Sequence, residues 1–386
     1  MDRNLIALLI VGLISGTYWS LIYPIYQPFI ISLGASMTIL GLIEALAGRM
    51  GLISTLTQLL GGILADEYGR KRVLVLASLI VIIGLSLYLL SALYLKLEYL
   101  FLGSIFIAIA GMGYPARNAL IADITKQEVR GLIYGLMMFS TIIPSVIFSP
   151  IGGWIAENIG IKIIFIISLF MEATCLLILT LILTEKHYSG KRSGFNLKTI
   201  FESLFPRESL MRKFYLLMTI DVFSWNLGST LLYGYISKVY GFTETQLGLM
   251  SSAFSASWAL SQIPAGKLTD KIGSKNILIL SEMVGVAPLI IWLIAKDFNS
   301  YLISHIIFGL SPALWIPALN TYLAEKVSKD KLAKTMGGIS AFRGIISFPA
   351  PYIGGLLFDL YGIQIPILIN LIGTVIVTIG LVFLKE

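Results

Sequence analysis

Apolar residues gather in long runs along the 386-residue chain, and mostly short polar segments separate these runs. A helix needs roughly 20 mostly apolar residues to cross a bilayer. The pattern therefore predicts an all-α integral membrane protein. Twelve runs are long enough, and we place the spanning helices at residues 4–32, 38–62, 73–95, 99–124, 131–156, 162–184, 213–237, 245–266, 276–296, 300–325, 333–358 and 363–384.

One polar connection divides the twelve predicted helices into two sets of six. Residues 185–212 form a segment much longer than the other connections, and it is rich in basic residues. We predict a cytoplasmic linker there. It joins an N-terminal six-helix bundle at 1–184 to a C-terminal six-helix bundle at 213–386.

Composition and charge support lipid as the solvent of this chain. Charged residues make up 13% of it, about half of the ~25% that is usual in soluble domains. If both termini lie on one side, the loops of that side hold 21 lysines and arginines, and the other loops hold four. The positive-inside rule then places both termini in the cytoplasm. It also explains the net charge of +7 without a nucleic-acid partner.

Few residues suit metal binding or catalysis. The chain has two histidines and one cysteine, all in separate segments. These residues cannot build a structural zinc site, and they offer no nucleophile–base pair. We therefore expect no enzyme activity, no metal and no cofactor.

Short motifs recur in the two halves. "PARNALIAD" at 115–123 matches "PALNTYLAE" at 317–325, and the same offset of 202 brings Gly152-Gly153 onto Gly354-Gly355. "GILADEYG" at 62–69 matches "GKLTDKIG" at 266–273 at an offset of 204. Repeats at corresponding places in two membrane halves indicate a secondary transporter. We expect glycines such as Gly51, Gly62, Gly152 and Gly153 to permit close helix contact.

These motifs resemble those of the major facilitator superfamily. The loop after the second predicted helix resembles that family's GxLaDrxGRrr signature, and a weaker copy follows the eighth helix. The stretch "YPIYQPFIISLGAS" in helix 1 is similar to the proline-rich start of drug/proton antiporters. Helix 5 departs from the antiporter pattern, because "FSPIGG" has its proline one position later than GPxxGG. The resemblance implies two pseudo-symmetric six-helix bundles.

The resemblance also implies that the charged loop is a conformational latch. Asp66 lies near a helix end, where its carboxylate can accept backbone N–H groups or pair with Arg70. For the basic residues of the loop, an alternative is that they only set the orientation in the membrane. The predicted latch residues are Gly62, Asp66, Gly69, Arg70, Asp123, Asp270 and Glu325.

Ionisable residues inside apolar helices are costly and are functional candidates by default. The resemblance makes helices 3, 6, 9 and 12 peripheral, so we set aside Glu172 and Glu282 as residues that pair or reach toward the membrane surface. The other charges, with polar and aromatic residues on helices 7 and 8, predict a cavity for substrate and protons. Its residues are Glu44, Arg49, Arg117, Asp221, Trp225, Ser255, Gln262 and Arg343.

Asp221 is the candidate for proton coupling, because it lies about 12 Å inside helix 7 at 1.5 Å per residue. A static ion pair with Arg343 or Arg117 is the alternative. We predict a multi-pass, monomeric secondary transporter of the cell membrane. It moves a small amphipathic organic molecule by alternating access, as efflux coupled to protons. The alternatives are a metabolite or organic-anion carrier, favoured by the arginines, and a channel, which the pattern favours least.

Overall fold

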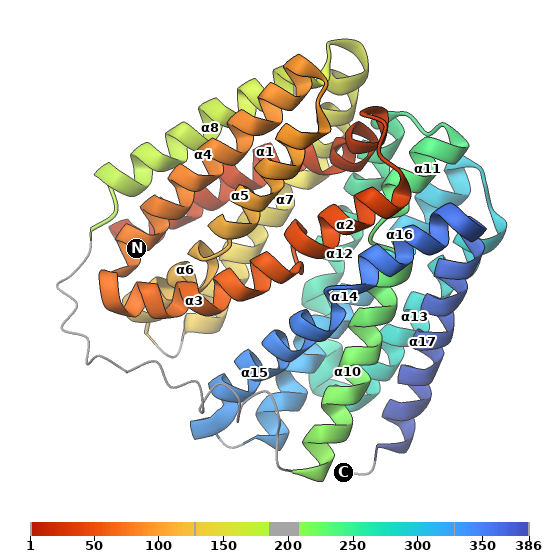
Figure 1. Ribbon diagram of the computed structural model, residues 1–386. Helices are drawn as coiled ribbons and strands as arrows, with labels where there is room; N and C mark the ends of the chain where they lie inside the picture. The colour runs from red at the N-terminus through yellow and green to blue at the C-terminus, as the bar shows by residue number, and fades with distance from the viewer. Residues whose placement is uncertain (1, 127–128, 185–207, 328, 385–386) are drawn as a thin grey trace. The chain divides into compact units, whose positions relative to one another are not determined.

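The computed structural model describes residues 2–126, 129–184, 208–327 and 329–384, and all regular elements in these ranges are helices (Figure 1). The first half contains α1 (Arg3–Ser32), α2 (Met37–Ala47), α3 (Leu52–Tyr68), α4 (Arg70–Tyr94), α5 (Leu97–Ala110), α6 (Gly113–Ile124), α7 (Arg130–Asn158) and α8 (Ile161–Leu181). The second half contains α10 (Ser209–Gly228), α11 (Leu232–Tyr240), α12 (Glu244–Ile272), α13 (Ser274–Ile294), α14 (Phe298–Lys326), α15 (Lys329–Ser347), α16 (Ala350–Tyr361) and α17 (Gln364–Phe383). Most of the predicted linker, residues 185–207, lies outside the described residues.

Four of the predicted spans are not continuous helices. Spans two, four, seven and eleven are each built from two consecutive helices: α2 and α3, α5 and α6, α10 and α11, and α15 and α16. Glycine or proline stands at three of these breaks, for example Gly111 and Pro349. Such residues interrupt the backbone ladder of a helix, but an apolar run does not reveal the interruption.

Ten helices or joined helix pairs of the described chain are long and apolar enough to span a membrane. The two other predicted spans coincide with α10–α11 and α12. The helix α12 carries serines at 251, 252, 255 and 257 and several charged residues, which lower its apolar content. Polar residues within membrane helices are costly and are functional candidates.

The helices form two compact units. Of the described residues, unit 1 takes those within Met1–Ala35, Leu46–Phe195 and Thr243–Gly248, and unit 2 takes the remainder. In unit 1, α1 packs on α7 and α8, and α4 packs on α5 and α8. In unit 2, α13 packs on α14 and α17, and α10 packs on α15, α16 and α17. Each unit therefore has an apolar core of its own.

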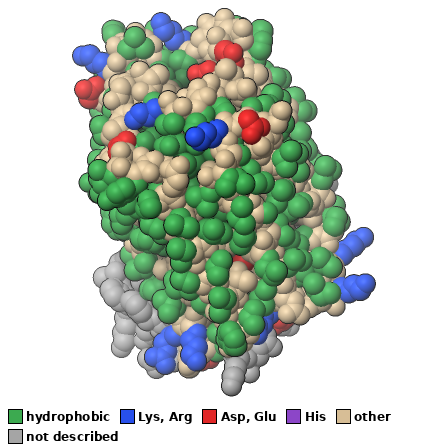
Figure 2. Space-filling model, turned by 90° about the vertical axis from the view of Figure 1, so that its right-hand side faces the viewer, with side chains coloured by type: hydrophobic (Ala, Val, Ile, Leu, Met, Phe, Trp, Pro, Cys, Tyr) green, Lys and Arg blue, Asp and Glu red, His purple; other side chains and the backbone are tan. Residues whose placement is uncertain are grey.

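The surface of the chain is suited to lipid. Hydrophobic side chains cover much of the face shown in Figure 2. Large apolar residues on several helices are between 73% and 78% exposed: Phe170, Leu181, Leu260, Ile294 and Phe383. A soluble monomer rarely leaves so much apolar surface in water.

Candidate functional site

Arg70 is the centre of the charged cluster in unit 1. Gly69 adopts φ +96°, a value that favours glycine, and so turns the chain from α3 into α4. Arg70 is the first residue of α4 and is only 8% exposed. Its guanidinium forms an ion pair with Asp123 on α6, lies 4.0 Å from Asp66 on α3, and donates a hydrogen bond to the Ala119 carbonyl. One buried arginine therefore ties three helices together.

The structure brings the predicted latch residues Asp66, Arg70 and Asp123 together. Gly62, in contrast, does not make the close helix contact that was expected of it. A side chain at Gly62 would meet only Pro115 at ordinary contact distance, whereas one at Gly61 would collide with the backbone of Met112. The close approach of α3 to the α5–α6 junction thus occurs at Gly61. One residue along a helix turns the side chain by about 100°, so neighbouring glycines face different partners.

The second copy of this cluster, in unit 2, has no arginine. Ser274 stands 204 positions after Arg70, at the start of α13. Its hydroxyl donates a hydrogen bond of 2.7 Å to Glu325 on α14, while Asp270 is exposed on α12. The repeat therefore keeps the position of the contact but replaces the ion pair with a neutral donor.

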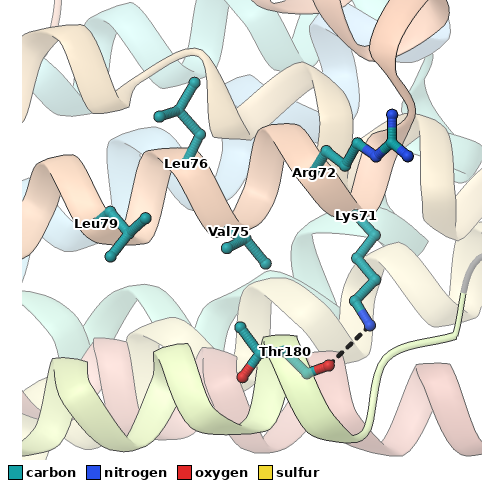
Figure 3. A pocket seen from close by; sticks show the side chains of 6 residues that line it. All are labelled: Lys71, Arg72, Val75, Leu76, Leu79 and Thr180. Carbon is teal, nitrogen blue, oxygen red and sulfur yellow. Dashed lines mark hydrogen bonds between the residues drawn. The ribbon is translucent and has the colours of Figure 1, made fainter.

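Lys71 makes a hydrogen bond to the end of α8 that the sequence did not lead us to expect. Its ammonium donates to the carbonyl oxygen of Thr180 at 2.7 Å, at the C-terminal end of α8, where a cation is favourable (Figure 3). Lys275 donates to the carbonyl of Leu384 at 2.8 Å, just after α17. Lys275 lies 204 positions after Lys71, and Leu384 lies 204 positions after Thr180. The repeat offset therefore relates the two lysines in the sequence itself.

Arg72 differs from its two basic neighbours. It is exposed and points away from Thr180 at the rim of a shallow hollow of about 520 Å³ (Figure 3). The hollow is otherwise lined by Lys71, Val75, Leu76, Leu79 and Thr180. Arg72 adds positive charge to the first turn of α4, as Arg70 does, but the structure shows no ion pair between it and Asp66 or Asp123 among the described residues.

Unit 2 holds a buried cluster of two acids and one base. Asp221 on α10 is 5% exposed, and Arg343 on α15 donates to its carboxylate at 3.2 Å. Arg343 also donates to the carbonyl of Met218 and lies over the ring of Trp315, 4.6 Å from its centroid. Glu282 on α13 is 3% exposed and within electrostatic range of both Asp221 and Arg343.

Of the two outcomes expected for Glu282, pairing or reaching toward the membrane surface, its burial excludes the second. It faces the interior of unit 2, because α13 packs on α14 and α17. Of the two partners considered for Asp221, Arg343 is the one it contacts. Asp221 thus pairs with the Arg343 guanidinium, and a second buried carboxylate, Glu282, lies within electrostatic range of both.

The other cavity candidates of unit 2 differ in burial and in their neighbours. Trp225 stacks on Phe308 with ring centroids 5.1 Å apart. Ser255 is buried and Gln262 half-buried on α12. Glu44 is half-buried on the part of α2 that belongs to this unit.

Two arginines of unit 1 interact electrostatically. Arg117 on α6 lies over the ring of Tyr114 at 5.2 Å and is within electrostatic range of Arg49. The Nε atom of Arg117 is buried and has no hydrogen-bond partner among the described residues. Arg49 is exposed in the break between α2 and α3, not within a helix as the sequence suggested.

The paired glycines make close helix contacts, as predicted for Gly152 and Gly153. A side chain at Gly152 would collide with the backbone of Leu21, and one at Gly354 with that of Leu227. Gly153 and Gly355 likewise contact the backbone at the first turn of α12 and of α2. These contacts require glycine because main chain meets main chain.

Carboxylates next to these glycines bind the same two helix ends. Asp359 accepts from the N–H groups of Met37 and Thr38 and from the Thr38 hydroxyl, at 2.7 to 3.1 Å. Glu157 accepts from the N–H and hydroxyl of Thr245. A carboxylate from another helix thus satisfies the first N–H groups of α2 and of α12. Sequence reasoning missed both acids, although they are 202 positions apart like the glycines.

Comparison with known proteins adds three findings. The family model "Major Facilitator Superfamily" matches residues 8–220 and 214–386. The "multi-drug resistance efflux pump PmrA" of Streptococcus pneumoniae is 27% identical over 90% of this chain and 86% of its own length, and "multidrug resistance protein MdtG" of Rahnella sp. is 24% identical over 94% and 88%. The solved structure of the nucleoside transporter NupG superposes with a TM-score of 0.77 at 14% identity, covering 100% of this chain and 99% of that one.

Proposed function

The chain belongs to the Major Facilitator Superfamily, and from this premise we propose that it exports small amphipathic organic compounds in exchange for protons. It is a multi-pass protein of the plasma membrane and a secondary active transporter of a small molecule. Its family consists of transporters and not of enzymes. The names of PmrA and MdtG, which describe multidrug resistance, support the export direction and the broad substrate class.

The observation that carries proton coupling is the cluster of Asp221, Glu282 and Arg343. With both acids ionised, the cluster has one negative charge in excess, and an uncompensated charge away from water is very unfavourable. One bound proton makes the cluster neutral. Release of that proton leaves a site that attracts a cationic or strongly polar group of the substrate, so proton and substrate compete for it.

The aromatic side chains of unit 2 suit the apolar part of such a substrate. Trp225 and Phe308 are stacked, and Phe254 lies 4.9 Å from Phe308 between ring centroids. Binding sites for small molecules combine apolar walls with a few placed polar groups. The acids would then select for charge, and the rings would accept many shapes.

An organic anion is the second substrate class, and the two arginines of unit 1 favour it. Arg117 and Arg49 bring two positive charges close together, and guanidinium groups bind carboxylates well. The dependence of transport on substrate charge separates the classes. Competition by lipophilic cations supports the first, and competition by organic carboxylates supports the second.

We further propose that both termini are cytoplasmic and that the protein works as a monomer. The excess of 21 basic loop residues over four supports the orientation. One chain supplies both repeats of the fold, so a second copy adds nothing that the fold requires. In this orientation the cluster of Asp66, Arg70 and Asp123 lies at the cytoplasmic side and acts as the latch.

Replacing Arg70 by glutamine is expected to lower the transport rate by about tenfold, a factor that corresponds to ~1.4 kcal/mol. The change removes a base that contacts both Asp66 and Asp123. Arg72→Gln is the matched control, because it removes the same charge from the same loop without touching these acids. Rates are measured in vesicles with equal amounts of protein. Equal losses in the two variants would show that the arginines act only through orientation.

Export is tested directly in cells. Cells that express the protein should accumulate less of a fluorescent lipophilic cation than cells with an empty vector, and a protonophore should remove the difference. A difference that survives the protonophore argues against proton coupling. No difference for lipophilic cations, together with export of an organic carboxylate, would favour the second substrate class.

A further inference from the structure

Glu172 is a buried acid in unit 1 that the proposed cycle has not yet used. It lies on α8, is 4% exposed, and faces α1 and α4. Its carboxylate accepts a hydrogen bond of 2.8 Å from the hydroxyl of Tyr18 on α1 and another from the hydroxyl of Ser78 on α4. Of the two outcomes expected for Glu172, pairing or reaching toward the membrane surface, the second is wrong, because this face of α8 points inward.

The groups around Glu172 provide hydrogen bonds but no positive charge. Tyr18 and Ser78 are its hydrogen-bond partners, Cys175 lies on the next turn of α8, and Tyr114 on α6 interacts with Tyr18. The described part of α7, which also packs on α8, contributes no hydrogen bond or charge to it. Within the described ranges, Glu172 forms no ion pair, in contrast to Asp221 with Arg343.

This surrounding suits an acid that gains and loses a proton. An ionised carboxylate without a counter-charge is costly here, so the neutral form of Glu172 is favoured. Asp221, in contrast, has Arg343 as a counter-charge. The ionised form still has two hydroxyl donors. Hydroxyl groups both donate and accept, so they can also bond to the protonated acid after rotating. Both protonation states are therefore hydrogen-bonded without repacking.

We propose that Glu172, held by Tyr18 and Ser78, is a second proton-binding site of the transporter, located in unit 1. The proton leaves the carboxyl oxygen for water and returns to the same oxygen, so no other reactant is needed. The two donors come from α1 and α4. A shift of these helices relative to α8 would therefore break the hydrogen bonds that stabilise the ionised form. Helix movement and protonation are thereby linked. The role in transport rests on the proposed proton coupling, whereas the proton binding itself does not.

Infrared difference spectroscopy of the purified full-length protein tests the site without a ligand. Raising the pH should remove carboxylic C=O bands from the wild-type spectrum. Glu172→Gln, which keeps the shape and a hydrogen-bonding amide, should delete one of these bands. Tyr18→Phe should shift the same band, because it loses a bond to that carboxyl. An unchanged difference spectrum in Glu172→Gln would overturn the proposal.

Transport measurements separate this inference from the proposed function. In vesicles, Glu172→Gln should reduce transport driven by a pH gradient by about tenfold, corresponding to ~1.4 kcal/mol. Without a pH gradient, the variant should still exchange radiolabelled cation on one side of the membrane for unlabelled cation on the other. Such exchange shows that the variant is folded. If the wild type itself shows no proton-linked transport but the infrared band still depends on Glu172, the proposed function fails and the proton site stands. If coupled transport is the same in Glu172→Gln and wild type, the role in the cycle is refuted.

Discussion

Asp221→Asn is expected to remove the dependence of transport on a pH gradient while leaving substrate exchange intact. In this variant Glu282 and Arg343 remain, so the cluster is neutral without a bound proton. The ratio of the transport rate with a pH gradient to the rate without one should fall by about tenfold or more. A tenfold change corresponds to ~1.4 kcal/mol of lost coupling. Rates in vesicles with and without a pH gradient measure it.

Two further substitutions act as controls for this result. Glu282→Gln should behave like Asp221→Asn, because it also leaves one acid and one base. Arg343→Gln should instead destabilise the protein, since loss of one partner from a buried pair costs about 3–5 kcal/mol. Retention of wild-type pH dependence in Asp221→Asn would identify a static ion pair.

Gly152→Ala is expected to lower thermal stability strongly, because the added methyl group collides with the backbone of Leu21. Overpacking of this kind costs about 1–3 kcal/mol. The repeat-related Gly354→Ala should have the same effect through its contact with Leu227. Melting temperatures in detergent are the measurement.

Gly135 provides a matched control on the same helix. A side chain at Gly135 has no atom within 4 Å in its way. Gly135→Ala should therefore be neutral or stabilising by up to about 1 kcal/mol, from the helix preference of alanine. The two substitutions on α7 thus have opposite expected signs. A drop of similar size in both would mean that the close contact at Gly152 is not what holds α1 to α7.

The sequence predicted the features that depend on one residue's position along the chain. The helical runs and the repeat both follow from spacing. The choice between Arg343 and Arg117 as the partner of Asp221 did not, because spacing alone does not say which helices pack together. The breaks at Gly111 and Pro349 were missed for a related reason, since membrane helices tolerate both residue types.

The decision to set Glu172 and Glu282 aside as candidates has one physical cause. Both were set aside because their helices were expected to be peripheral, which treats a helix as having one environment. Each of these helices has an inward face as well as a lipid face, and both acids lie on the inward one. The same reason moved the close contact from Gly62 to Gly61. A position on a helix face becomes known only when the packing partner is known.

The repeat preserves geometry more strictly than chemistry. Gly152 and Gly354 make equivalent contacts, and so do Lys71 and Lys275. Arg70, in contrast, has Ser274 at its corresponding position. Features present in both halves therefore maintain the fold, and features present in one half are the better candidates for the latch and for proton coupling.

Proton flux in proteoliposomes tests the central claim most directly. The wild-type protein is reconstituted with a pH-sensitive dye inside, and a gradient of a fluorescent lipophilic cation is imposed without any initial pH gradient. Antiport predicts that protons move in the direction opposite to the cation and that Asp221→Asn abolishes this movement while cation exchange continues. Cation movement through the wild-type protein with no change of internal pH would contradict the account.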